Sequence, residues 1–336
     1  MASFLIDMPI PEIRIIKDTL LSIYLDTNVL IELSRYEKGC CTNEHIDKIG
    51  ALHSTLQTLM QEKRIFCVLG NQLEEMGTSR AREDARNFLY RFTNKELKTP
   101  SQIKNIQLKS GYRAFAENEP VSVFRASDIA KKTICVSNSS IEVHAVPMYS
   151  VEQIEKFKQD KKILATTLND VKSNGKIAKN YDDQLGLELK ADFQVFLHNL
   201  EHYADSQDDY MNMLDALATV YRRVGMDPYN ASHSDIIKAV DSHNHFLLSS
   251  YHHKLPYVWI CSALFAHIMQ RQNTIRPSDN LDITWASAYL PFVDYAVTDT
   301  VFCNLLNQSG LAESYGTKVY CFKTLNSLLQ SLRGIT

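Results

Sequence analysis

The stretch YLDTNVLI at residues 24–31 decides the fold class of this 336-residue chain. Residues 22–25 form a short apolar run that stops abruptly at Asp26. Such a run is typical of a buried strand in a parallel sheet, and these sheets bind ligands at the carboxyl ends of their strands. Asp26-Thr27-Asn28 is a helix-start sequence, and the apolar residues after it predict an amphipathic helix. The stretch therefore predicts a strand, a turn that carries polar groups, and a helix.

Strand and helix signals alternate on both sides of this stretch and again near the end of the chain. The predicted helices lie at 11–21, 47–62, 281–289, 300–309 and 325–332, and the predicted strands at 64–69, 294–298 and 318–322. Another helix, which contains Glu74 and Glu75, follows a turn at Gly70-Asn71. This alternation predicts an α/β fold with a central parallel sheet.

Residues 80–270, between these segments, show mostly helical periodicity. We expect helices at 80–92, 151–164, 185–203 and 210–224, whereas 99–150 reads as irregular, with short strands at 133–136 and 141–146. The simplest interpretation is one α/β domain, residues 1–80 and 275–336, interrupted by a large, mainly helical insertion at residues 81–274.

The composition is that of an ordinary globular protein, with 45% apolar and 22% charged residues. A formal net charge of -3 means that binding to nucleic acid would need a local basic patch. The seven cysteines show no Cys-x-x-Cys spacing, which fits a reducing compartment. The start of the sequence is a poor signal peptide, and no apolar run reaches the roughly 18–20 residues of a membrane span. We therefore expect a cytoplasmic protein without a membrane partner.

Four acidic positions lie where a predicted strand ends or where a neighbouring helix begins. They are Asp26, Glu75, Asp282 and Asp299. Because the carboxyl ends of parallel strands meet at one edge of a sheet, we expect these side chains to come together. Clustered carboxylates repel one another unless a cation lies among them, and hard oxygen ligands suit Mg²⁺ or Mn²⁺. Glu74 is the alternative to Glu75, and Asp279 and Asp294 are the alternatives to Asp282.

Four motifs resemble those of the PIN-domain ribonucleases. They are residues 24–31, 73–76, 282–288 and 297–302, within the segments 20–80 and 275–330. The resemblance implies an α/β/α fold in which Asp26, Glu75, Asp282 and Asp299 bind the metal. It also implies that Thr27, Asn28 and Thr298 support these ligands, while Asp294 is either a further supporting residue or structural. The large insertion departs from the compact form of many PIN domains.

The resemblance implies metal-dependent endonucleolytic cleavage of RNA, with single-stranded RNA as the expected partner. In this mechanism the metal lowers the pKa of a bound water and neutralises charge on the phosphate. Arg80, Arg82 and Arg86 follow the second acidic motif and are candidates for substrate binding. A protein inhibitor or a second copy of the chain is a conceivable partner. The alternatives are a DNA or structure-specific nuclease and a non-catalytic scaffold that binds RNA or protein.

Each candidate residue also has an ordinary structural interpretation. Aspartate is among the best helix N-caps, which applies to Asp26, Asp282 and Asp299. Glutamates on a helix are usually solvent-exposed, which applies to Glu74 and Glu75. The arginines at 80, 82 and 86 alternate with acidic neighbours, so they also fit a solvated, salt-bridged helix face. The metal-site interpretation depends on the first and last motifs occurring together.

Overall fold

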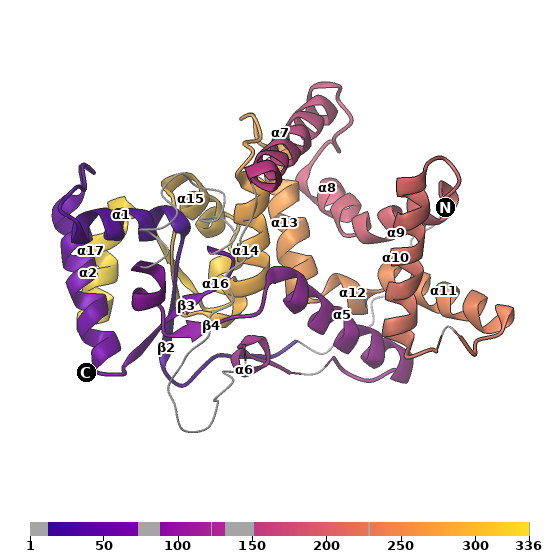
Figure 1. The fold of residues 1–336 in the computed structure, drawn as a ribbon, viewed down its shortest axis with the longest axis horizontal. Helices are drawn as coiled ribbons and strands as arrows, with labels where there is room; N and C mark the ends of the chain where they lie inside the picture. The colour runs from indigo at the N-terminus through magenta and orange to yellow at the C-terminus, as the bar shows by residue number, and fades with distance from the viewer. Residues whose placement is uncertain (1–12, 73–87, 122, 132–150, 228, 336) are drawn as a thin grey trace. The chain divides into compact units, whose positions relative to one another are not determined.

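The computed structural model describes residues 13–72, 88–121, 123–131, 151–227 and 229–335 (Figure 1). Contacts divide the chain into two compact units. Unit 1 comprises Met1–Arg14, Lys104–Phe124 and Ala178–Ala266, and unit 2 comprises Ile15–Ile103, Arg125–Ile177 and His267–Thr336. Among the described residues, no helix is both long and apolar enough to cross a membrane.

Unit 2 is built on a five-stranded sheet with the order β4-β3-β2-β6-β7. Its strands are β2 (Leu21–Leu25), β3 (Ile65–Leu69), β4 (Lys95–Glu96), β6 (Tyr295–Val297) and β7 (Lys318–Tyr320). Every pairing between these neighbours is parallel. The predicted α/β class with a parallel sheet is therefore confirmed. The first predicted strand, which ends at Asp26, is the central one.

Helices cover both faces of this sheet because successive residues of a strand point to opposite faces. On one face, Ile23 and Leu25 join a buried core with α1 (Thr27–Glu37), α2 (Ile46–Gln61) and α17 (Leu325–Arg333). On the other face, Tyr24 stacks on Trp285 of α14 (Asp279–Tyr289) with ring centroids 4.5 Å apart. The remaining elements are β1 (Ile15–Ile16), β5 (Phe124–Arg125), α6 (Ala126–Ile129), α7 (Val151–Ser173), η1 (Leu290–Phe292), α15 (Thr300–Gln308), α16 (Leu311–Ser314) and η2 (Phe322–Thr324).

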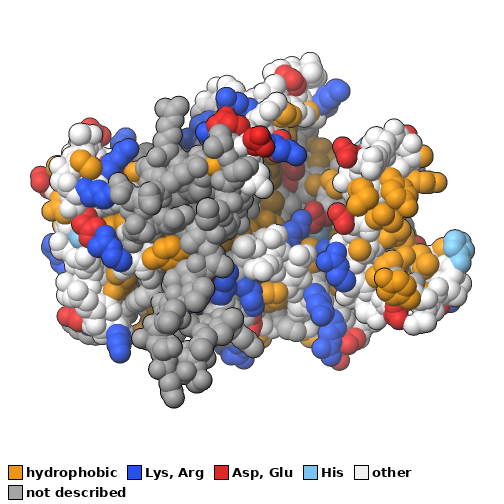
Figure 2. Space-filling model, viewed as in Figure 1, with side chains coloured by type: hydrophobic (Ala, Val, Ile, Leu, Met, Phe, Trp, Pro, Cys, Tyr) orange, Lys and Arg blue, Asp and Glu red, His pale blue; other side chains and the backbone are white. Residues whose placement is uncertain are grey.

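The described part of unit 1 is helical. It contains α8 (Tyr181–Glu188), α9 (Ala191–Glu201), α10 (Gln207–Val224), α11 (His233–Leu248), α12 (Ser250–His253) and most of α5 (Pro100–Glu117) and α13 (Pro256–Gln270). Lys104 and His252 both bind the carboxylate of Asp192, at 2.8 and 3.2 Å. Hydrophobic side chains gather on the surface over α9 and α10 (Figure 2), where Val195 and Met211 are exposed.

Three local predictions were wrong. The described part of the predicted helix at 11–21 contains β1 and the start of β2 instead, because β-branched isoleucines favour extended backbone. The predicted single helix at 185–203 is broken between α8 and α9. The segment 99–150 begins with the 18-residue helix α5. The missed signal is a capping box on either side of Pro100. The side-chain oxygen of Gln102 accepts a hydrogen bond from the backbone N–H of Thr99, and the hydroxyl of Thr99 accepts one from the backbone N–H of Gln102.

Other predictions stand apart from these observations. The strands predicted at 133–136 and 141–146 lie outside the described residues. The predicted domain boundaries remain predictions, although β4 and α7 belong to unit 2 while their residues fall within the predicted insertion at 81–274. Strand β4 was not predicted at all, because a two-residue strand shows no periodicity.

Candidate carboxylate site

Asp26 lies at the carboxyl end of the central strand and is 3% exposed. It is the N-cap of α1, and its Oδ1 accepts a hydrogen bond of 2.7 Å from the backbone N–H of Thr27. Its Oδ2 accepts a 3.3 Å bond from the hydroxyl of Thr298, which follows the neighbouring strand β6. Its backbone N–H donates to Val297 at 2.9 Å. The sheet therefore fixes this carboxylate from two adjacent strands, and helix capping uses one of its two oxygens.

Asp299 follows Thr298 and is the N-cap of α15. Its Oδ1 accepts hydrogen bonds from the backbone N–H groups of Val301 and Phe302, at 2.7 and 3.0 Å. Its Oδ2 lies 3.8 Å from a guanidinium nitrogen of Arg276. Asp26 and Asp299 are thus the N-caps of the helices that follow two neighbouring strands. The N-terminal end of a helix favours negative charge, so both carboxylates are stabilised there.

Asp279 and Asp282 lie in the first turn of α14, three residues apart and each 8% exposed. Their spacing places both carboxylates on one side of the helix. Arg276 contacts both, with its Nη2 2.8 Å from Asp279 and 3.7 Å from Asp282. The same nitrogen lies 3.8 Å from Asp299, so three carboxylates lie around one guanidinium at this edge of the sheet.

Electrostatics at Arg276 reflect this crowding. Burial lowers the pKa of the guanidinium, but the nearby carboxylates of Asp279, Asp299 and Asp282 outweigh burial and raise that pKa above its ordinary value. Arg276 was not identified as a functional residue from the sequence. The available signal was its position three residues before Asp279, ahead of the helix predicted at 281–289, because a cation and an acid at that spacing can form a local ion pair.

The end of β3 carries buried amides that connect it to the central strand. The hydroxyl of Tyr24 donates to Asn71 at 2.9 Å, and the amide of Gln72 donates to the carbonyl of Leu25 at 3.0 Å. These bonds hold Asn71 and Gln72, the two residues directly before the second acidic motif at 73–76. Glu74 and Glu75 themselves lie outside the described residues, as do Arg80, Arg82 and Arg86.

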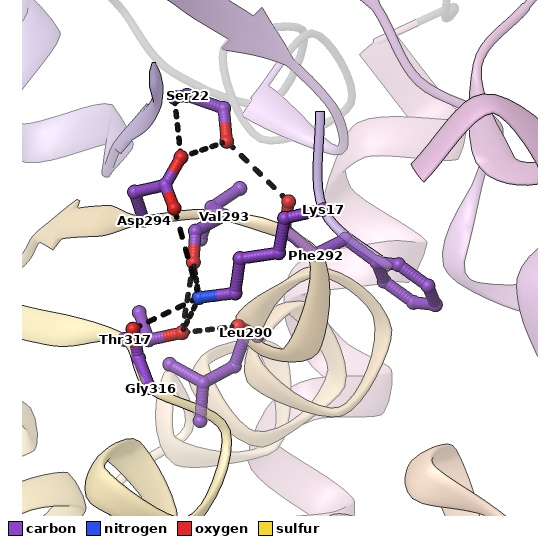
Figure 3. Close-up of polar contacts among 8 residues, drawn as sticks. All are labelled: Lys17, Ser22, Leu290, Phe292, Val293, Asp294, Gly316 and Thr317. Carbon is purple, nitrogen blue, oxygen red and sulfur yellow. Dashed lines mark hydrogen bonds and ion pairs between the residues drawn. The ribbon is translucent and has the colours of Figure 1, made fainter. Parts of the chain in front are cut away.

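Asp294 lies at the opposite edge of the sheet, before β6 rather than after it (Figure 3). Its Oδ2 accepts hydrogen bonds from the backbone N–H and the hydroxyl of Ser22, at 2.8 and 3.1 Å. Its Oδ1 lies 3.9 Å from the ammonium of Lys17. This position does not support a role beside Asp26, because the length of β6 separates Asp294 from the carboxyl edge. Of the two interpretations left open, the structural one fits.

Of the other predicted supporting residues, Thr27 and Asn28 lie on α1 and Thr298 follows β6. Thr27 is buried and its backbone N–H binds Asp26, whereas the side chain of Asn28 is exposed. Thr298 therefore makes the side-chain contact to Asp26, while Thr27 contributes a backbone donor. The structure thus brings Thr27 and Thr298 to Asp26 and directs Asn28 to solvent.

Carboxylate oxygens are the donor set that suits Mg²⁺ or Mn²⁺. Within the described part of the chain, no three His, Cys, Asp or Glu side chains are grouped closely enough to hold a metal ion. Arg276 lies among the acids of this edge, and Glu75 is not among the described residues. No protein-family model matches the chain, and searches of curated proteins and of solved structures give no significant match.

Proposed function

We propose that this protein is a PIN-like, metal-dependent nuclease that cleaves single-stranded RNA internally. The observation that carries the proposal is the position of Asp26. It is a buried carboxylate at the carboxyl end of the central strand. It accepts a hydrogen bond from Thr298, which follows the neighbouring strand β6, and Asp299 is the next residue after Thr298. Ligands of parallel α/β sheets bind at this edge. The family resemblance of residues 24–31 and 297–302 adds the substrate class, which rests on that resemblance alone.

Asp26, Asp282 and Asp299 would hold the metal ion, together with Glu75 from the second motif. A bound Mg²⁺ or Mn²⁺ supplies Lewis-acid stabilisation of the phosphate and a water of lowered pKa. The residues of the chain orient these carboxylates before any ligand arrives. Thr298 fixes Asp26, and the first turn of α15 fixes Asp299 through its backbone N–H groups. Metal binding would still have to draw the carboxylates closer together, because no three of the described ones are grouped closely enough to hold an ion.

The proposal extends to the remaining parts of the chain. The mainly helical residues 81–274 would form an insertion that selects the substrate or binds a partner, either a protein inhibitor or a second copy. Arg80, Arg82 and Arg86 would contribute phosphate contacts beside the second acidic motif.

The test is cleavage of a labelled single-stranded RNA and of DNA with the same sequence, in Mg²⁺ or Mn²⁺. The variant Asp26→Asn keeps the side-chain shape and removes the charge that a metal ion requires. The matched control is Asp160→Asn, the same change at an exposed position of α7. We expect wild type and Asp160→Asn to cleave RNA, and expect cleavage to disappear in Asp26→Asn and in EDTA. Equal cleavage by wild type and Asp26→Asn contradicts the proposal.

One observation favours a second candidate, the non-catalytic RNA- or protein-binding scaffold. Arg276 already neutralises carboxylates that a metal ion would otherwise neutralise. A scaffold would bind RNA or a protein without cleaving nucleic acid, and its melting temperature would not rise with Mn²⁺. The DNA arm of the cleavage assay separates the remaining alternative, a DNA or structure-specific nuclease.

A further inference from the structure

The guanidinium of Arg276 is anchored on one carboxylate. Nε and Nη2 both lie 2.8 Å from Oδ1 of Asp279, and the backbone N–H of Arg276 donates to Oδ2 at 2.9 Å. Both oxygens of Asp279 are therefore engaged by a single residue. By contrast, the distances from Nη2 to Asp282 and Asp299 are 3.7 and 3.8 Å, which is beyond ordinary hydrogen-bond length. Asp279 anchors Arg276, whereas Asp282 and Asp299 are only near it.

The backbone before Arg276 is held by α7. The side-chain oxygen of Asn169 accepts a 2.8 Å hydrogen bond from the N–H of Ile275, and its amide donates to the carbonyl of Ile275 at 3.0 Å. One turn further along α7, Lys172 donates to the carbonyls of Ile268 and Asn273, at 3.2 and 2.8 Å. A single helix thus fixes the connection between α13 and α14 that presents the guanidinium.

The Arg276 side chain is only partly buried, and 42% of it is exposed. An arginine has five N–H donors, and the anchor on Asp279 uses only the Nε and Nη2 side of the fork. A planar guanidinium that is held in place and keeps exposed donors is suited to bind a phosphate. A nucleic-acid strand approaching Asp26, Asp282 and Asp299 also needs a cation, because those carboxylates repel its phosphates.

We infer that Arg276 binds a backbone phosphate of the nucleic-acid strand, and that Asp279 and Asn169 are positioning residues that hold it there. This inference rests on the proposed function and names a substrate contact of that site. It also assigns Asp282, rather than Asp279, to the proposed metal ligands, because both oxygens of Asp279 are occupied by Arg276.

The test is binding of a short labelled single-stranded RNA, followed by fluorescence anisotropy in EDTA over a series of KCl concentrations. It needs neither a metal ion nor cleavage. Arg276→Gln should weaken binding about tenfold, because it removes one charge-assisted contact. It should also reduce the slope of log affinity against log salt by roughly 0.7, the contribution of one phosphate in a single strand. A merely structural role would leave that slope unchanged.

Three further variants make the test specific. Arg276→Lys keeps the charge but loses the two-nitrogen anchor on Asp279, so it should keep the wild-type salt slope and restore only part of the affinity. Asn169→Ala should weaken binding less than Arg276→Gln does, also with the wild-type slope. The matched control is Arg35→Gln, since Arg35 is 51% exposed and bonded to Glu32 three residues away. This control should bind as wild type does, and circular dichroism checks that every variant is folded.

The outcomes separate this inference from the proposed function. If wild type cleaves RNA while Arg276→Gln binds with the wild-type affinity and slope, the inference is wrong and the proposed function stands. Stronger Mn²⁺ binding by Arg276→Gln without weaker RNA binding would identify Arg276 as a competitor of the metal, which also overturns the inference. If wild type binds RNA without cleaving it and Arg276→Gln weakens that binding, the inference holds without the nuclease. Wild type that neither binds nor cleaves RNA contradicts both.

Discussion

Each edge of the sheet in unit 2 has a cation beside carboxylates, but the two cations differ in their exposure and in their hydrogen-bond partners. At the amino edge, Lys17 donates to the carbonyls of Val293 and Gly316 and to the hydroxyl of Thr317, at 2.6, 3.0 and 3.0 Å (Figure 3). Only 19% of the Lys17 side chain is exposed. At the carboxyl edge, the Arg276 side chain is 42% exposed, and among the described residues a single carboxylate lies within hydrogen-bond distance of its guanidinium. Lys17 is therefore largely enclosed by protein groups, whereas the Arg276 side chain is partly exposed.

The pKa directions of the two cations agree with this difference. At Lys17, burial lowers the pKa more than the carboxylate of Asp294 raises it. At Arg276, burial also lowers the pKa, but the carboxylates of Asp279, Asp299 and Asp282 outweigh it. A buried charge whose hydrogen-bond partners are protein groups stabilises a fold. A partly exposed charge that lies near several opposite charges can also bind a ligand. Position at one edge or the other therefore separates the structural acid Asp294 from the candidate ligands.

The largest expected effect separates the two acids of α14. Asp282→Asn should reduce RNA cleavage about 100-fold or more, because it removes a proposed metal ligand that stabilises charge on the phosphate. Asp279→Asn should reduce cleavage only about tenfold, because it loosens Arg276 and leaves the ligands in place. Cleavage rates at saturating Mn²⁺ measure both. A larger loss in Asp279→Asn would reverse the assignment of these two residues.

The next prediction compares one substitution at the two ends of β6. Asp294→Asn should lower the free energy of unfolding by about 1–3 kcal/mol, because Lys17 loses its counter-charge and Ser22 a charged acceptor. Cleavage by the folded protein should be unchanged. Asp299→Asn should keep stability, since asparagine caps a helix as well as aspartate does, and should lose cleavage. Urea unfolding and cleavage assays on both variants check this, and equal behaviour would remove the distinction between the edges.

A third prediction concerns the packing beneath the carboxyl edge. A Cβ atom at Gly70 would lie 2.5 Å from the ring of Tyr289, which is fully buried and cannot move aside. Gly70→Ala should therefore destabilise the protein by about 1–3 kcal/mol. Urea unfolding measures the change, and Gly186→Ala, where the added Cβ meets nothing within 4 Å, is the control. A neutral Gly70→Ala would mean that the segment after β3 is loosely packed.

The smallest expected effect is a pH dependence at the amino edge. Because the pKa of Lys17 is lowered in the folded protein, the unfolded chain binds more protons at pH values between that lowered pKa and 10.5. The contribution of Lys17 to stability should therefore rise with pH across this window. The difference in unfolding free energy between wild type and Lys17→Met should increase as pH approaches 10.5. A difference that decreases over this range would show that the ion pair with Asp294 outweighs burial.

The sequence predicted the strand that ends at Asp26 and the later elements of the sheet because their periodicity is local. Asp294 and Asp299 lie at opposite ends of β6, a strand only three residues long. The strand predicted at 294–298 already placed Asp294 at its start and Asp299 directly after its end, and β6 at Tyr295–Val297 agrees with both positions. Arg276 was missed because its importance depends on Asp299, which α14 and β6 bring close in three dimensions.

In the proposed function, the acids of the carboxyl edge bind a divalent cation. Titration of the protein with Mn²⁺, with free Mn²⁺ measured by electron paramagnetic resonance, tests it most directly because it requires no substrate. We expect wild type and Asp160→Asn to bind Mn²⁺ with the same affinity, and Asp26→Asn to bind it at least about tenfold more weakly, since a buried carboxylate ligand loses its charge. Mn²⁺ binding that is absent in wild type, or unchanged in Asp26→Asn, would contradict the account.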